Sequence, residues 1–457
     1  MKMTKMIFGA ALVLLAANFC RATESTNLPA WLTRPLSLAD ALNTALIQNA
    51  TILKAKNDLE AEQGLVIQTR AVALPLVTAN GTYEYQQSRG IESFPNSPQQ
   101  PGHSWSTGIK VVQTVYDGGR SIAALRSANV TKKQSLAMYQ TAVADTLLQV
   151  RLAYYNVLLA AQQIVVRDAS VNLLEKERDD QQHRLDAGTV PKFNVLRAEV
   201  AVANERPPLI QARNSYRIAK NNLANLLGYD LPRDVWEDIP LNLTDGFDTA
   251  PMEVNLPDVI QQALQKRTEL EALRGTVDLQ KLNVVNARSG YQPAISLFAG
   301  YDWASARFAP PLDAGHYFDG WSAGAQLNWN IFDGALTYGK VKQAKAEYAK
   351  AKTDLADQQR QIELGVRTAY SDLLQARETL DSQMKVQEEA DESLREAKAR
   401  ADAGTSTQLD VLNAETALTQ ARTTQITAEH DYAAARASFE RAIGNDLAPV
   451  KQGGTVK

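Results

Sequence analysis

An internal duplication of nearly the whole chain limits the fold more than any other feature of this sequence. Leu38, Asp40 and Pro75 recur as Leu256, Asp258 and Pro293, 218 positions later. Further matches then hold a separation of 216, among them Trp105/Trp321, Asp117/Asp333, Gly188/Gly404, Thr189/Thr405, Leu196/Leu412, Glu199/Glu415 and Gly228/Gly444. A chain that repeats one pattern in this way is expected to build the same structural unit twice.

The duplication sets the expected division of the chain. Residues 1–22 are predicted to be a signal peptide, residues 23–228 the first repeat and residues 254–444 the second. The segment 229–253 joins the repeats and is expected to lie as a small belt outside the helices. Residues 445–457 are expected to form a flexible C-terminal tail.

The N-terminus has the layout of an export signal. Lys2 and Lys5 precede an apolar run over residues 6–17, and a small-residue cleavage site follows, with cleavage expected after Ala22. Lipid attachment at Cys20 and a retained N-terminal anchor are the alternatives, although Phe19 stands where a lipoprotein signal needs a small residue. Cys20 is the only cysteine. The expected location is therefore the periplasm or the outer membrane, with no disulfide in the mature chain.

Composition and motifs argue against nucleic-acid binding, metal binding and catalysis. Lys and Arg number 48 against 51 Asp and Glu, so the net charge of −3 offers no basic surface to nucleic acid. The four histidines, His103, His183, His316 and His430, lie far apart in sequence, and no cofactor or metal motif is present. An exposed His183 as metal or pH sensor is the alternative. No nucleophile elbow or nucleotide loop is found, so the chain is not expected to be an enzyme.

Segments with two different faces predict transmembrane β-strands. From Trp321 to Ile331, apolar residues alternate with Ser322, Gly324, Gln326, Asn328 and Asn330, and a similar alternation runs through residues 77–85. Such alternation over about ten residues is typical of strands with one face to lipid and one to a lumen. The expected membrane-interface aromatics are Tyr83, Tyr85, Trp105, Tyr301, Trp303, Trp321 and Trp329. A half-buried sheet of a soluble domain is the alternative.

The remaining pattern predicts very long helices. Val143, Val150 and Val157 belong to a seven-residue series from Leu136 to Val171, and a second series, from Val341, shifts by four residues between Ile362 and Val366. Each long helix would run from Asp117-Gly118 or Asp333-Gly334 to a turn at Gly188 or Gly404, spanning about 70 residues and ~105 Å. A helix over residues 38–73 and a returning helix after each turn would together match its length. Pro207-Pro208 should kink the first returning helix.

The predicted strands cannot form a barrel within one chain. We expect four strands per chain, whereas a closed barrel needs about eight, and lipid tolerates no open sheet edge. Three copies would supply twelve strands, with the long helices forming a tube below them. The fold class is thus an α+β membrane protein: a trimeric 12-stranded transmembrane β-barrel continuous with a long α-helical coiled-coil barrel in the periplasm.

The sequence resembles the TolC family of outer-membrane efflux proteins. The resemblance rests on Leu38-Ala39-Asp40-Ala41-Leu42, on Tyr116-Asp117-Gly118-Gly119 and Phe332-Asp333-Gly334, and on the two tips, Ala187-Gly188-Thr189 and Ala403-Gly404-Thr405. It implies a homotrimeric duct in the outer membrane whose tip meets a periplasmic adaptor protein, joined to an inner-membrane pump of the RND, ABC or MFS type.

The resemblance also implies roles for residues at the tips. Gly188, Thr189, Leu196, Gly404, Thr405 and Leu412 match the adaptor-docking surface. Asp410 matches an acidic ring that narrows the tunnel entrance, with Asn413 where some relatives carry a second acid and Asn194 at the equivalent position of the first repeat. The alternative for Asp410 is a helix cap with Thr407.

The expected function is passive export through this duct, energised by the partner pump. The alternative is a periplasmic or surface coiled-coil spacer or adhesin without a channel. The sequence does not identify the cargo, the pump class, the adaptor or the gating mechanism.

Overall fold

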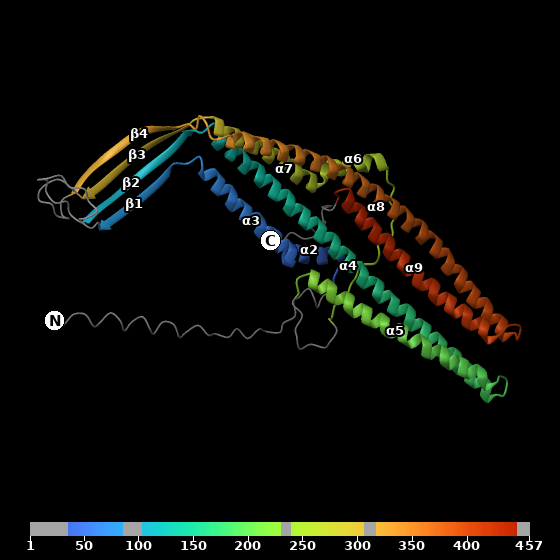
Figure 1. The fold of residues 1–457 in the computed structure, drawn as a ribbon. Helices are drawn as coiled ribbons and strands as arrows, with labels where there is room; N and C mark the ends of the chain where they lie inside the picture. Colours follow the sequence, from blue (N-terminus) through green and yellow to red (C-terminus); the bar gives the residue numbers. More distant parts are fainter. Residues whose placement is uncertain (1–34, 86–102, 230–238, 306–316, 446–457) are drawn as a thin grey trace, which may run out of the picture.

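A computed structural model describes residues 35–85, 103–229, 239–305 and 317–445. The predicted signal peptide with Cys20, nearly all of the predicted tail and part of the inter-repeat segment lie outside the described residues. In Figure 1 a small sheet occupies one end of the molecule, and long helices run from it to two hairpin tips at the other end.

The order of elements repeats, as the duplication predicted. The first half contains α2 (Leu38–Gln48), α3 (Ala50–Ala71), β1 (Leu76–Tyr85), β2 (His103–Tyr116), α4 (Arg120–Asp186) and α5 (Lys192–Leu226). The second contains α6 (Leu256–Lys266), α7 (Thr268–Arg288), the short 3-10 helix η2 (Ser289–Tyr291), β3 (Ala294–Ser305), β4 (Tyr317–Asn328), α8 (Leu336–Asp402) and α9 (Gln408–Ala442). Both long helices have 67 residues, close to the expected length.

The predicted single helix over residues 38–73 is wrong, because the chain breaks at Asn49. Asn49 has an extended backbone, and its side-chain oxygen accepts hydrogen bonds from the N–H groups of Thr51 and Ile52. This starts a new helix, α3, in a new direction. The Asn49 amide also donates to the carbonyl of Leu226 at 2.6 Å, so the break ties α3 to the end of α5.

The four strands form one antiparallel sheet in the order β1-β2-β3-β4, which joins the two repeats through β2 and β3. The predicted last strand is displaced: β4 ends at Asn328, so Trp329 and Ile331 lie beyond it and Trp321 lies inside it. Asn328 pairs with Ala294, the first residue of β3. Pro293 precedes it and has no N–H to donate, which ends the ladder there.

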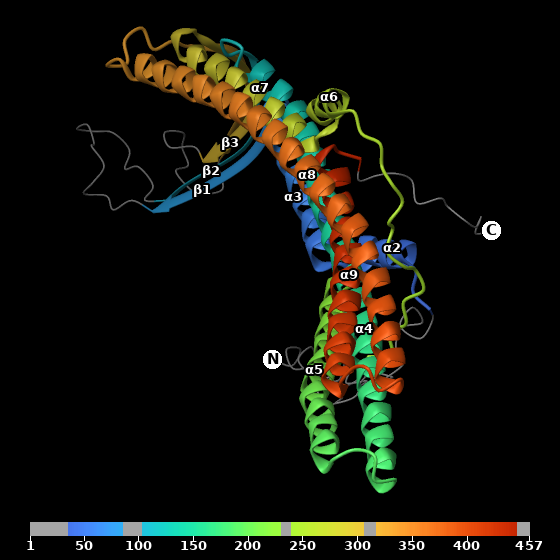
Figure 2. The same ribbon diagram turned by 90° about the vertical axis from the view of Figure 1, so that its right-hand side faces the viewer.

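Apart from α2 and α6, which project from one side in Figure 2, the helices form one layer in which four lie side by side (Figures 1 and 2). Near the sheet the order is α3, α4, α7, α8, and toward the tips it is α5, α4, α9, α8. Two short helices therefore pair along each long one, as predicted. One 18-residue window of α4 is hydrophobic enough to cross a membrane by length and composition alone, and this helix has neighbours on both sides.

The coiled-coil seams are largely confirmed. Val143, Val150 and Val157 are buried in α4, whereas Leu136, at the sheet end, is 47% exposed. In α8 the buried residues Ile362, Val366, Leu373 and Leu380 follow the predicted shift of register. Pro207 and Pro208, where a kink was predicted, lie inside α5, and the helix continues through both.

The largest core cluster lies halfway along the helices and includes the inter-repeat segment. Tyr154 and Tyr155 of α4 are buried against Leu36 and Leu241, two residues from opposite sides of the first repeat in sequence. The Tyr154 hydroxyl donates to the Leu36 carbonyl at 3.0 Å and accepts from the N–H of Asp245 at 3.2 Å. The described part of the segment is thus fastened to the helices through buried side chains.

Candidate functional site

The two hairpin tips turn by the same mechanism. Each long helix ends in a glycine with a positive φ of 73°, Gly188 or Gly404, followed by a threonine whose N–H bonds back to a carbonyl of the last helical turn. This is a Schellman motif, which favours glycine because other residues are strained at positive φ. The threonine hydroxyls of Thr189 and Thr405 donate to the same carbonyls, at 2.8 and 3.0 Å. Of the six predicted docking residues, the four in these turns, Gly188, Thr189, Gly404 and Thr405, are exposed.

The two predicted docking leucines have different surroundings. Leu196 of α5 is 48% exposed, whereas Leu412 of α9 is 8% exposed. Leu412 packs against Leu174 of α4 and Val202 of α5. Within one chain, therefore, Leu412 joins the two hairpins, and Leu196 lies on the surface.

The three predicted constriction residues, Asp410, Asn413 and Asn194, also differ in their surroundings. Asp410 is exposed and forms a capping box at the start of α9, where its carboxylate accepts from the Thr407 N–H and hydroxyl, both at 2.8 Å. These hydrogen bonds lower the pKa of Asp410 below its usual value. Asn413 is exposed one helical turn further on. Asn194 instead lines a cleft between the hairpins.

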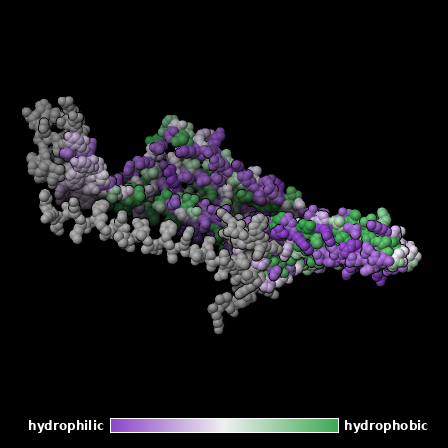
Figure 3. Space-filling model, turned by 90° about the horizontal axis from the view of Figure 1, so that it is seen from below, coloured by the Kyte–Doolittle hydropathy of each residue, from purple (hydrophilic) through white to green (hydrophobic). Residues whose placement is uncertain are grey.

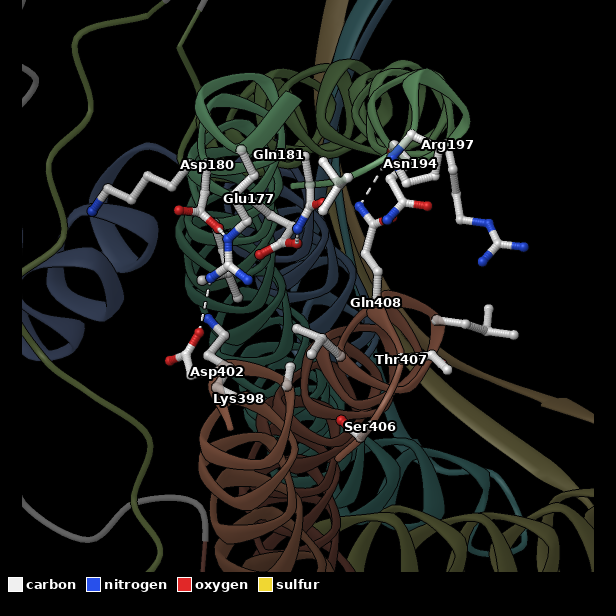
Figure 4. Close-up of a pocket in the computed structure, with 18 residues that line it drawn as sticks. Glu177, Asp180, Gln181, Asn194, Arg197, Lys398, Asp402, Ser406, Thr407 and Gln408 are labelled. Carbon is white, nitrogen blue, oxygen red and sulfur yellow. Dashed lines mark hydrogen bonds and ion pairs between the residues drawn. The ribbon is translucent and has the colours of Figure 1, made fainter. Parts of the chain in front are cut away.

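This cleft, of about 720 Å³, opens between the tips of the α4–α5 and α8–α9 hairpins (Figure 4). Arg184 of α4 reaches across it to Asp402 of α8 at 2.9 Å, and this contact raises the pKa of Arg184. Gln408 of α9 donates to the carbonyl of Asn194 at 3.2 Å. Sequence reasoning missed these cross-hairpin contacts, because the paired residues lie more than 200 positions apart.

A buried carboxylate lies next to the cleft. The Glu415 side chain is 2% exposed, and its nearest opposite charge is the ammonium of Lys398, 3.1 Å from Oε1. Burial raises the pKa of Glu415, and the negative charge of Glu177 adds to this, although Lys398 opposes it. The duplication matched Glu415 to Glu199, which is exposed. No sequence signal distinguished the two.

The predicted interface aromatics lie on one face of the sheet and its margins. The register places Tyr83 opposite Trp105 and Tyr301 opposite Trp321, and Trp321 is 79% exposed. Near the loop end of the strands, Tyr85 stacks obliquely on His103, and Trp303 on Tyr301. Trp329 lies at the opposite, helical end, where its ring N–H donates to the carbonyl of Tyr291. The set therefore marks both ends of the strands.

Comparison with known proteins decides between the remaining alternatives. The sequence matches the family described as outer membrane efflux protein over residues 41–229 and 259–445, which is most of both repeats. The chain belongs to this family. Its relatives include the outer membrane protein TolC of Escherichia coli, which is 23% identical, with 89% of this chain and 82% of that protein covered. The alkaline protease secretion protein AprF of Pseudomonas aeruginosa is 23% identical, with 87% and 82% covered.

The fold also matches solved outer-membrane channels. The CmeC outer membrane channel of Campylobacter jejuni superposes with a TM-score of 0.78 at 16% identity, covering 90% of this chain and 86% of that one. The chain is accordingly an outer-membrane exit duct of an efflux or secretion system, with its helical tunnel in the periplasm. This supports the channel over the coiled-coil spacer. Members of the family are channels rather than enzymes.

Proposed function

We propose that three copies of this chain close into one duct and that its hairpin tips receive a periplasmic adaptor protein joined to an inner-membrane pump. The proposal gives the chain no catalytic step and no cofactor. Transport energy would come from the pump, and the duct would provide only the passage.

The supporting observation is that sheet and helical layer end in matching open edges. Within the described residues, β1 pairs only with β2, and β4 only with β3. Unpaired strand edges are not tolerated in lipid, and four strands are too few to close a barrel, for which about eight are needed. Three copies, joined head to tail from β4 of one to β1 of the next, give twelve strands.

The two outer helices of the layer also expose apolar side chains that a neighbouring copy could cover. On the β1 side, α5 leaves Phe193, Val200 and Ile210 more than half exposed. On the β4 side, α8 exposes Leu364 and Met384. Figure 3 shows hydrophobic side chains among hydrophilic ones along the helical part of the molecule. In the proposed trimer a neighbouring copy would cover the exposed apolar side chains of α5 and α8.

For the tips we propose two roles. The exposed turns at Gly188-Thr189 and Gly404-Thr405, with Leu196 beside the first, would form the docking surface, and Leu412 would hold α9 beneath it. Three Asp410 carboxylates would form the ring at the tunnel entrance, in addition to capping α9. These carboxylates would be charged at neutral pH, since the hydrogen bonds from Thr407 lower the pKa of Asp410, and a ring of negative charge suits cation selection.

The first test is the molar mass of the chain extracted from outer membranes in mild detergent, measured by light scattering with the detergent subtracted. A mass of three chains of 50.1 kDa each, less their signal peptides, supports the proposal. A monomer or dimer would overturn it.

The second test is the reversal potential of single channels in a salt gradient. Asp410→Asn should lower cation selectivity, and Asn413→Asp should raise it by adding a second ring. Asn194→Asp is the matched control, because Asn194 lies in the cleft. An unchanged reversal potential in Asp410→Asn and Asn413→Asp would remove the constriction from the proposal.

A further inference from the structure

The face of the sheet opposite Trp321 carries four of the five glycines of the described strands. Gly108, Gly300, Gly320 and Gly324 lie on this face, and only Gly81 lies on the face of the aromatics. In a membrane barrel with its apolar aromatics toward lipid, the opposite face lines the lumen. Most of the strand positions without a side chain therefore lie on the lumenal wall of the proposed duct.

The glycines are placed beside the large side chains of this face. Residues that pair across β2, β3 and β4 form rows on this face. In three successive rows the charged or aromatic side chain is Asp302, then Lys110, then Phe298. Asp302 pairs with Gly108 on one side and Gly320 on the other, Lys110 pairs with Gly300, and Phe298 pairs with Gly324. Each prominent side chain thus has a glycine directly across the ladder.

Two of these glycines are covered by the neighbouring side chain. A Cβ atom added to Gly108 would lie 2.0 Å from Oδ1 of Asp302, and Gly108 is buried although the rest of β2 is at least partly exposed. A Cβ added to Gly324 would lie 2.9 Å from the tip of the Phe298 ring. Asp302 and Phe298 therefore lie along the wall of the sheet and do not project from it.

Lys110 is oriented by the same arrangement. Its ammonium lies 5.1 Å from the centre of the Phe298 ring, within range of a cation–π interaction. The ring that rests on Gly324 thus supports Lys110 as well. Asp302 and Lys110 are in adjacent rows, so their opposite charges offset each other along this part of the lumen.

We propose that Gly108 and Gly324 are positioning residues for conduction: they leave the space in which Asp302 and Phe298 lie against the barrel wall, and so keep the lumen open and its wall charge balanced. A methyl group at either position would turn the neighbouring side chain toward the lumen in every copy. This proposal rests on the duct proposed above, because only a closed barrel has a lumen.

The test is thiol labelling inside the barrel. Gln326, which lies on the same face of β4 beyond Gly320 and Gly324 when counted from the loop end, is replaced by cysteine in a Cys20→Ala background. Outer membranes are treated from the extracellular side with a small charged methanethiosulfonate and with a polymer-linked maleimide. Gly108→Ala and Gly324→Ala should slow labelling by the bulky reagent roughly threefold or more while leaving the small reagent's rate within about twofold, since pore diameter sets access.

The chain supplies two matched controls. A Cβ at Gly320 meets nothing within 4 Å, and one at Gly81 meets only the Thr107 hydroxyl at 3.8 Å, so Gly320→Ala and Gly81→Ala should label like the parent. Removing the ring in the double variant Phe298→Ala/Gly324→Ala should restore the bulky reagent's rate. This rescue separates obstruction from poor folding, which heat-resistant oligomers on gels would reveal independently.

The outcomes separate the two proposals. If Gly108→Ala and Gly324→Ala label no more slowly than Gly320→Ala, or if removing Phe298 does not rescue Gly324→Ala, the positioning role is wrong although the duct stands. If the cysteine at position 326 reacts with neither reagent even in the parent, this face does not line a water-filled lumen, and the duct itself fails.

Discussion

The returning helices α5 and α9 come from equivalent parts of the two repeats and have 35 residues each, yet they occupy different environments. The α9 helix lies between both long helices, whereas α5 packs mainly against α4. Accordingly α5 exposes Phe193, Leu196, Val200, Ile210 and Ile218, while Leu409 is the large hydrophobic side chain that α9 exposes. The duplication gave α5 and α9 the same length, and the position of each helix in the layer decided how much of its apolar surface is buried.

The ends of the two helices show how equivalent tasks are met by different chemistry. The Asn49 amide donates to the carbonyl of Leu226 at the end of α5, and the Arg267 guanidinium, at the equivalent break, donates to the carbonyls of Arg441 and Ala442 at the end of α9. Arg441 in addition bonds to Asp145 of α4 and Glu269 of α7. Charged groups of two neighbouring helices thus hold the end of α9, whereas the Asn49 amide holds the last residue of α5.

The largest expected difference in unfolding free energy is between alanine variants of Leu412 and Leu196. Leu412→Ala removes a side chain buried between the hairpins and should cost about 2–4 kcal/mol of unfolding free energy, whereas Leu196→Ala should cost about 0.5 kcal/mol or less. The measurement is denaturant unfolding followed by circular dichroism. Equal losses would mean that the assembled protein buries both leucines alike.

The second-largest effect concerns the glycines that follow α5 and α9, Gly228 and Gly444, whose replacement by alanine should cost different amounts of unfolding free energy. In Gly228→Ala the new Cβ would lie 2.4 Å from the backbone oxygen of Gln48 at a φ of 82°, so we expect a loss of about 2 kcal/mol or more. Gly444→Ala has a φ of 73° and a 3.2 Å approach to the Lys266 side chain, and should lose about 1 kcal/mol. The same unfolding measurement checks both, and a larger loss at Gly444 would contradict the difference in crowding.

Removing the partner of Glu415 tests the buried carboxylate. Lys398→Met should destabilise the chain by about 1–3 kcal/mol at pH 7, because it leaves Glu415 buried and unpaired. Since burial raises the folded-state pKa of Glu415, the folded state binds its proton more tightly than the unfolded state, and stability falls as pH rises through that pKa.

The loss in Lys398→Met should therefore shrink toward pH 5, where protonation removes the unpaired charge. Glu199→Gln, at the exposed equivalent of Glu415, is the control and should leave the pH dependence of unfolding as it is. A loss in Lys398→Met that is constant with pH would show that Glu415 is not the group responsible.

The smallest effect concerns the turns into the long helices. Gly119 precedes α4 with a φ of 90°, whereas its equivalent before α8 is Ala335, a non-glycine residue with a φ of 67°. Ala335→Gly should stabilise the chain by about 0.5–1 kcal/mol, because the Cβ of alanine is sterically strained in a left-handed backbone conformation and glycine has no Cβ. The shift in unfolding midpoint measures this, and a destabilised variant would mean that lost chain entropy outweighs the relieved strain.

Sequence reasoning reached most of the fold because the evidence for it is local. Gly188 and Gly404 mark turns through their own conformational freedom, and the shift from Ile362 to Val366 follows from side chains on one helix. It failed at Asn49, whose cap depends on a polar residue that a helical pattern also accommodates, and at the end of β4, which Pro293 sets from another strand. It also could not tell Leu412 from Leu196, because the duplication presents them as equals.

The sequence by itself determined the duplication, which is a comparison within the sequence. It also determined the two-faced strands, the two long helices of 67 residues and the turns that end them, since these depend on residues a few positions apart. Only the tertiary structure decided which returning helix lies between the long ones, that Arg184 meets Asp402, that Glu415 is buried while Glu199 is not, and that Gly108 lies beneath Asp302. These outcomes depend on contacts between residues far apart in the chain. Two copies of one pattern cannot occupy the same place in a layer, so equivalent residues acquire different neighbours.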